Sequence, residues 1–190
     1  MAPGTIALAV LAVLGLAVVA FYNRFVRSRN RVEAAWSDLD VQLERRHDLI
    51  PSLVEVVRGY AGHERATFDA VLTARSTGMA ARDPEALTGA EEQVAATMTR
   101  LMYVAEAYPE LKADARFRDL QIELGATENK IAFSRQLYND VVTSYANATQ
   151  SFPGLLLAGP LGFSPPALFA ADAPERIAVA VTFDTPEQGA

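Results

Sequence analysis

The feature that most constrains the fold of this chain is an uncharged apolar run near its N-terminus. Thr5 to Tyr22 reads TIALAVLAVLGLAVVAFY, eighteen residues without a charge, and Arg24 is the first charged side chain of the sequence. An α-helix rises about 1.5 Å per residue, so about 20 apolar residues cross the hydrocarbon core of a bilayer. Ala2 and Pro3 can extend the run. The run therefore predicts a single transmembrane helix.

A cleaved signal peptide is the alternative interpretation of this run. Signal peptides usually carry a basic segment ahead of the apolar core, and the four residues before Thr5 have no charged side chain. We therefore favour an anchor. Four arginines flank it on the C-terminal side: Arg24, Arg27, Arg29 and Arg31. By the positive-inside rule they predict an inner-membrane protein with its N-terminus outside and its C-terminal domain cytoplasmic. The arginines can contact anionic lipid headgroups or form a solvated helix face.

Beyond the anchor, apolar residues recur at helical, heptad-like spacing: Phe25, Val32, Trp36, Leu39 and Leu43. The membrane helix is therefore expected to continue into a soluble bundle. Pro51 removes a backbone donor and clashes with the preceding turn, which predicts a kink and a second helix from Pro51 to about Thr77. Gly59 and Gly62 inside that helix suggest close approach of a neighbouring helix.

Two more helices are expected after a loop that contains STGMAARDPE. Asp83 is placed to cap a helix from Pro84 to about Tyr108, and Pro109 restarts a fourth helix that runs to about Gln150. At about 1.5 Å per residue this helix would be about 60 Å long. Its seam alternates steps of three and four: Phe117, Leu120, Leu124, Thr127, Ile131, Ser134, Tyr138, Val141 and Tyr145. Phe133 and Leu137 lie off the seam, which suggests neighbours on two sides.

The character of the sequence changes after Gln150. The segment SFPGLLLAGPLGFSPPALFAADAP holds five of the ten prolines and is too broken to span a bilayer. It fits a loop packed over the bundle end and, equally, an interfacial or partner-contacting segment. The tail then alternates apolar residues with period two: Ile177, Val179, Val181 and Phe183. Such a strand needs a second strand, so it is expected to pair with another copy or a partner, or else to be disordered.

These patterns predict an all-α fold: an elongated antiparallel bundle of about four long helices on an N-terminal transmembrane helix, with a short β-type tail. The expected parts are an anchor over residues 1–23, a helical bundle over 24–150, and an apolar Pro/Gly-rich segment with a possible assembly strand over 151–190.

Two stretches resemble the LemA family. They are YNRFVRSRNRVEAAWSDLDVQLERRHDLIPSLVEVVRGYAGHE over 22–64 and TENKIAFSRQLYNDVVTSYANATQSFPGLLLAGPLGF over 127–163. Together they cover most of residues 22–163 in the family's order. The resemblance implies a membrane-anchored helical-bundle protein, and one branch of the family is associated with bacterial organelle membranes. After Phe163 the chain carries neutral Pro and Ala where the family's motif has lysines.

Several kinds of chemistry find little support in the sequence. The net charge of −6 argues against a nucleic-acid partner, and zero cysteines exclude disulfides and thiolate metal ligands. His47 and His63 are the only histidines, and a shared metal site would need the Pro51 kink to bring them together. We expect instead that His47 belongs to a charge network with Arg45, Arg46 and Asp48. Glu128 falls near a helix seam, where Arg75 or Arg135 can provide its partner.

No catalytic residue, metal ligand or cofactor-binding residue is assigned from this sequence. We expect a non-enzymatic scaffold that self-associates at the membrane through its helices and its tail. The alternative is an accessory or regulatory subunit of a membrane enzyme or protease complex. The expected partners are the lipid membrane, further copies of the chain and other membrane proteins.

Overall fold

The computed structural model describes residues 3–169, and every regular element in that range is a helix. The predicted all-α fold is confirmed for this part of the chain. The assembly strand predicted at Ile177, Val179, Val181 and Phe183 lies outside the described residues. The helices are α1 (Pro3–Tyr60), α2 (Arg65–Ala80), α3 (Pro84–Glu106), α4 (Pro109–Ala113), α5 (Ala115–Gln150) and α6 (Gly154–Ala158).

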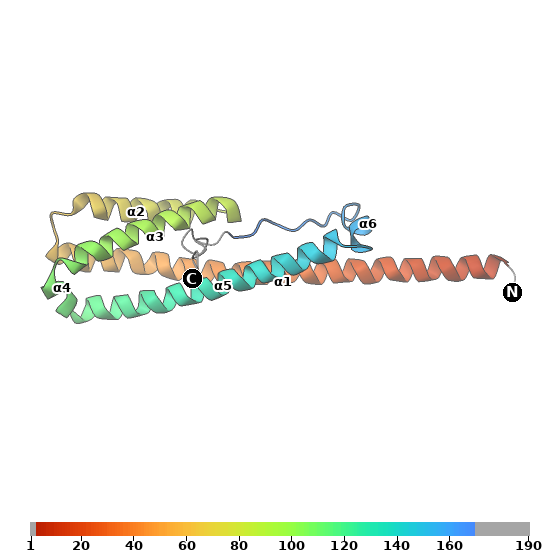
Figure 1. The fold of residues 1–190 in the computed structure, drawn as a ribbon, viewed down its shortest axis with the longest axis horizontal. Coiled ribbons are helices and arrows are strands. Elements are labelled where there is room, and N and C mark those ends of the chain that lie inside the picture. Colours follow the sequence, from red (N-terminus) through yellow and green to blue (C-terminus); the bar gives the residue numbers. More distant parts are fainter. Residues whose placement is uncertain (1–2, 170–190) are drawn as a thin grey trace, which may run out of the picture.

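One helix, α1, runs the whole length of the molecule (Figure 1). The 36-residue helix α5 packs antiparallel along it, and α2 and α3 form a second antiparallel hairpin over the end far from the N-terminus. The N-terminal part of α1 projects alone beyond the bundle, while α6 lies beside α1 where α5 ends (Figure 1). The expected continuation of the membrane helix into an elongated antiparallel bundle is therefore observed.

The core consists of two apolar clusters along the bundle axis. The distal cluster contains side chains from each of the helices α1, α2, α3, α4 and α5. It includes Ile50, Leu53, Val57, Phe68, Val71, Val94, Leu101, Leu111 and Phe117. The proximal cluster joins α1, α5 and the segment after α5 and includes Phe25, Leu39, Leu43, Tyr138, Tyr145 and Phe163. Burying one large apolar side chain contributes about 1.5–3 kcal/mol, so both clusters hold α5 firmly against α1. Arg46 and His47 lie between Leu43 of one cluster and Ile50 of the other.

The predicted break at Pro51 is wrong, because α1 continues through Pro51 to Tyr60. Proline cannot bond the carbonyl four residues earlier, which here belongs to His47. Arg75 of α2 supplies the missing donor, since its Nε lies 2.6 Å from the His47 carbonyl oxygen. The proline ring itself is exposed. The guanidinium therefore satisfies the acceptor that would otherwise interrupt the helix.

The chain reverses instead at Ala61–Glu64, between α1 and α2. The expectation that Gly59 and Gly62 mark close helix approach is also wrong. A Cβ at Gly59 would meet nothing within 4 Å, and Gly62 lies in the turn, 3.6 Å from the Arg58 carbonyl oxygen. Tight packing occurs at Gly78 and Gly154, as described below.

The remaining helix boundaries follow local capping signals. The Asp83 side chain accepts a hydrogen bond from the Ala86 backbone at 2.9 Å, so the predicted cap of α3 is confirmed. The predicted loop before it is shorter than expected, because α2 continues to Ala80. The fourth helix is interrupted at Asp114, whose carboxylate caps α5 by accepting from the Arg116 and Phe117 backbones. A short helix α4 therefore precedes α5.

Candidate functional site

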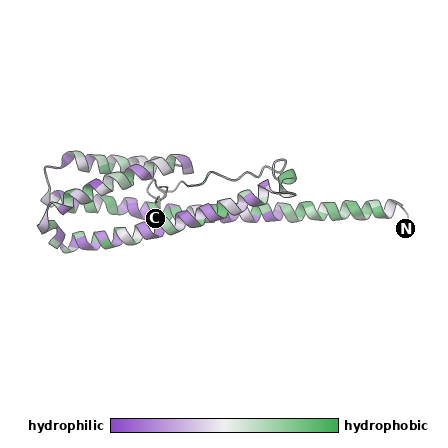
Figure 2. Ribbon diagram, in the orientation of Figure 1, coloured by the Kyte–Doolittle hydropathy of each residue, from purple (hydrophilic) through white to green (hydrophobic). Residues whose placement is uncertain are grey.

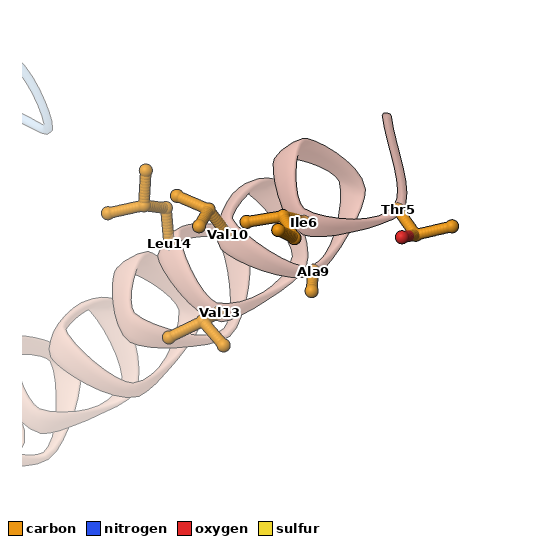
Figure 3. Close-up of a pocket in the computed structure, with 6 residues that line it drawn as sticks. All are labelled: Thr5, Ile6, Ala9, Val10, Val13 and Leu14. Atoms are coloured by element: carbon orange, nitrogen blue, oxygen red, sulfur yellow. The ribbon is translucent and has the colours of Figure 1, made fainter. Parts of the chain in front are cut away.

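The lone N-terminal part of α1 is a continuous apolar surface. Figure 2 shows it as the most hydrophobic stretch of the ribbon, and every side chain from residue 3 to residue 20 is exposed. This helix is long and apolar enough to cross a membrane. The shallow hollow in Figure 3 is lined by Thr5, Ile6, Ala9, Val10, Val13 and Leu14. All six belong to one helix and their side chains point outward, so the hollow is part of the exposed outer surface of α1 rather than a closed ligand cavity.

The four arginines predicted to flank the membrane lie exposed on the turns of α1 that follow this surface: Arg24, Arg27, Arg29 and Arg31. Arg29 is also engaged by the bundle. Its Nε lies 3.6 Å from Glu33 Oε1, and its guanidinium carbon lies 5.7 Å from the centre of the Phe163 ring. A cation–π contact of this kind contributes about 0.5–1 kcal/mol when exposed.

A polar network lies at the centre of the bundle and is formed around three buried side chains, Arg46, His47 and Glu91. The half-buried Arg75 and the exposed Glu128 complete it, and we call the five residues the buried polar network. Arg46 forms an ion pair with Glu91 of α3, and its Nη1 lies 3.1 Å from Glu128 Oε1 of α5. His47 Nε2 lies 2.9 Å from Glu91 Oε1. Because Arg75 of α2 donates to the His47 carbonyl, the buried polar network joins α1, α2, α3 and α5 at one level.

The electrostatics of the buried polar network keep His47 uncharged at neutral pH. Burial, and after it the positive charges of Arg46 and Arg75, together lower the pKa of His47 from 6.5 to about 4. A neutral ring that faces a carboxylate donates from Nε2, so His47 donates to Glu91. Within residues 3–169 the His47 Nδ1 has no hydrogen-bond partner, which suits its lone pair. Arg46 is therefore the cation that balances the Glu91 charge.

The buried polar network is tightly packed on one side and borders a small cavity on the other. A Cβ added to Gly78 would lie 2.8 Å from His47 Cε1 and 2.9 Å from Glu91 Oε1, so α2 approaches α1 and α3 closely here. A cavity of about 80 Å³ lies next to Arg46, Glu91, Glu128 and Arg135. This space suits one or two water molecules beside the charges rather than an organic substrate.

The structure reassigns several residues that the sequence singled out. His47 does belong to a charge network, but its side-chain partner is Glu91, and Arg45 pairs instead with Glu123 at 2.7 Å. His47 lies within α1 and His63 lies in the turn after it, and more than three turns, about 20 Å of helix, separate His47 from the end of α1 at Tyr60. No group of three or more metal-ligating side chains occurs in the part of the chain that the structure describes.

Sequence reasoning missed Glu91. The signal was present, because Glu91 occupies the seam position between Leu87 and Val94 in α3, all three of which are buried. A charge on an apolar helix seam requires a partner from another helix. The partner could not be identified from the spacing within α3 alone.

The segment after α5 folds back along the bundle. Tyr138 donates its hydroxyl to the Ala167 carbonyl at 3.0 Å, and the Asn139 amide pairs with both the N–H and the C=O of Phe169 at 2.9 Å each. The two Asn139 bonds reproduce the pattern by which a neighbouring strand binds a backbone. The predicted loop packed on the bundle is therefore present over residues 159–169.

The sequence model of the LemA family matches residues 35–183, which is most of the chain. The chain belongs to the LemA family. The buried polar network lies in the matched region, and the apolar part of α1 precedes it. Together with this apolar helix, the match identifies a membrane-associated member of the LemA family.

Curated relatives include two kinds of protein. The magnetosome protein MamQ 2 of Paramagnetospirillum magneticum (strain ATCC 700264 / AMB-1) is 27% identical over 188 residues, covering 82% of this chain and 69% of that protein. The magnetosome protein MamQ of Magnetospirillum gryphiswaldense is 25% identical, covering 80% of this chain and 68% of that protein. Protein LemA of Metamycoplasma hominis is 24% identical, covering 83% of this chain and 72% of that protein.

Proposed function

We propose that this chain is a membrane-anchored scaffold that assembles with copies of itself and catalyses no reaction. The observation that carries the proposal is an apolar stripe on the outer face of α5, formed by Ile122, Phe133 and Leu137. Spacings of eleven and four residues are close to three turns and one turn, so the three side chains share one face. Phe133 is 69% exposed and Leu137 38%. Large apolar side chains gathered in this way are typical of an interaction surface.

A second copy of the chain is the partner that the anchor favours. Anchoring confines all copies to one membrane with the same orientation, which raises their effective concentration. The α5 stripe of each copy then lies at the same distance from the membrane. Exposed apolar side chains spaced by nearly whole turns along a long helix suit packing against another helix. The sequence prediction that α5 has neighbours on two sides agrees with this arrangement.

The non-enzymatic part of the proposal is supported by the pairing within the buried polar network. Arg46, His47 and Glu91 are engaged with one another, and each contact joins two helices. Such pairs are well suited to fixing how helices pack. The positive-inside rule further supports a cell inner-membrane location with the bundle in the cytoplasm. The magnetosome proteins among the relatives support a role at a membrane.

The test is the mass of the full-length protein in detergent, measured by light scattering that separates detergent from protein. We expect a discrete multi-copy particle for the wild type and a smaller particle for the double variant Phe133→Asp/Leu137→Asp. Tyr103→Asp is the matched control, because Tyr103 is 68% exposed on α3, away from the stripe, and its particle should stay unchanged. Deletion of residues 176–190 separately tests the proposed tail strand.

A wild-type monomer would refute self-assembly. If that monomer bound one different membrane protein at a fixed ratio, the chain would be an accessory subunit instead. A multi-copy particle that survives both the α5 variant and the tail deletion would refute these contacts as the basis of assembly.

A further inference from the structure

Three apolar side chains around α6 are directed away from the bundle. Phe152 is 81% exposed, Leu155 58% and Leu156 63%, and we refer to these three as the α6 patch. No charged residue occurs anywhere between Asp140 and Asp172. Exposure of this apolar area to water is unfavourable, and no charged side chain nearby in the sequence offsets it.

The opposite side of α6 is fixed to α1 at the end of the apolar run. A Cβ added to Gly154 would collide with the Ala148 carbonyl and lie 3.3 Å from the ring of Phe25. The Phe163 ring packs against Phe25 and Tyr22, with centroid distances of 5.3 Å and 5.5 Å. These contacts hold α6 beside the turn of α1 where the apolar run meets its first arginine, Arg24.

The α6 patch therefore lies level with the end of the exposed apolar run of α1. From residue 3 to residue 20 the side chains of α1 are exposed, and Phe21 is the first that the bundle partly covers. The exposed Arg24 and Arg27 follow directly, at the position expected for lipid headgroups. A short apolar segment at this height lies in the interfacial layer, where an apolar side faces acyl chains.

We propose that the α6 patch is a second membrane contact, inserted into the same leaflet from which the anchor emerges. Its occupant is the lipid surface. The contact would fix the tilt of the bundle relative to the membrane, because the apolar part of α1 and the α6 patch would then attach it at two points. This proposal rests on membrane association and is independent of self-assembly through α5.

Because the natural chain has no cysteine, single-cysteine variants can report lipid contact site by site. The full-length variants Leu155→Cys and Leu156→Cys would be spin-labelled in phosphatidylcholine vesicles, and collision rates with oxygen and with a water-soluble nickel complex would be compared. Leu14→Cys supplies the value for lipid. Tyr103→Cys, at a similarly exposed residue in the last turn of α3, supplies the value for water.

We expect both α6 labels to collide more often with oxygen than with the nickel complex, like the Leu14 label and unlike the Tyr103 label. Labels as accessible to nickel as the Tyr103 label would overturn the proposal, because the patch would then face water. Labels shielded from both reagents would also overturn it, because protein, as in a contact with another copy, would then cover the patch. Circular dichroism confirms that each variant is folded.

Discussion

The bond from Arg75 to the His47 carbonyl explains why α1 continues through Pro51, and it predicts a specific thermodynamic coupling. Arg75→Met keeps most of the side-chain volume but removes the donor 2.6 Å from that carbonyl. The acceptor then has no donor, since proline cannot bond it. A buried polar group left unpaired costs about 1–3 kcal/mol, and we expect Arg75→Met to lower the free energy of unfolding by that amount.

The same substitution should cost much less when Pro51 is replaced. In Pro51→Ala the introduced alanine supplies the backbone N–H that the His47 carbonyl lacks, and a helix-interior proline disfavours the helix by about 3 kcal/mol relative to alanine. We therefore expect Pro51→Ala to leave stability unchanged or raise it. The cost of Arg75→Met in that background should fall by about 1–2 kcal/mol, which is the coupling free energy between residues 51 and 75.

The assay is urea unfolding of the full-length protein in mild detergent. Trp36 is the only tryptophan, and its ring lies 5.3 Å from that of Tyr138, so its fluorescence reports on packing of α1 against α5. Circular dichroism follows the helices in parallel. Arg65→Met, at an exposed arginine of α2, is the control for loss of a surface charge and should change stability by less than about 0.5 kcal/mol. Equal costs of Arg75→Met in both backgrounds would refute the explanation.

Three further predictions concern the buried polar network and the segment after α5. Glu91→Gln should lower the free energy of unfolding by about 3–5 kcal/mol in the same urea assay, because Arg46 loses its buried counter-charge. Glu92→Gln, at the exposed neighbouring residue, is the control and should change stability very little. The pKa of His47 is about 4 in the fold against 6.5 unfolded, so the unfolded state binds more protons between these values. Stability should therefore fall as pH drops from 6.5 towards 4, by up to about 3 kcal/mol, and His47→Gln should show a smaller fall over this window. Gly154→Ala should lower the free energy of unfolding by about 1–3 kcal/mol, because the added Cβ would meet the backbone of α5. Gly159→Ala is the control and should leave stability unchanged, because open space surrounds Gly159. Equal thermal midpoints for the two variants would contradict the packing described for α6.

Much of the fold could be predicted from local signals. The apolar run before Arg24, the heptad-like spacing that follows it, and Asp83 ahead of Pro84 each determine structure through residues a few positions apart. Their outcomes, a projecting helix, its continuation into the bundle and a capped α3, match the predictions. The four arginines after the apolar run are exposed on α1, and their position at a membrane surface stays a prediction.

The errors came where the deciding atom lies far along the chain. The cost of Pro51 within the helix depends in part on whether the freed carbonyl finds another donor, and that donor is Arg75, 24 residues later in another helix. Glu91 is 44 residues from His47, so no spacing rule connects the two. Side-chain donors from other helices follow from the tertiary fold, which local sequence patterns do not encode directly.

These distant contacts converge on one level of the bundle, and that convergence has a structural consequence. The two apolar clusters on either side of the buried polar network could each tolerate sliding of one helix past another, because apolar side chains interchange at modest cost. The Arg46–Glu91 pair cannot slide by a turn without leaving both charges unpaired in the interior, and the bond from Arg46 to the exposed Glu128 adds a contact with α5. Arg75, bonded to the one carbonyl that Pro51 frees, adds the same restriction for α2. The buried polar network therefore favours one register of all four long helices, and with it the height at which α6 lies beside the end of the apolar run.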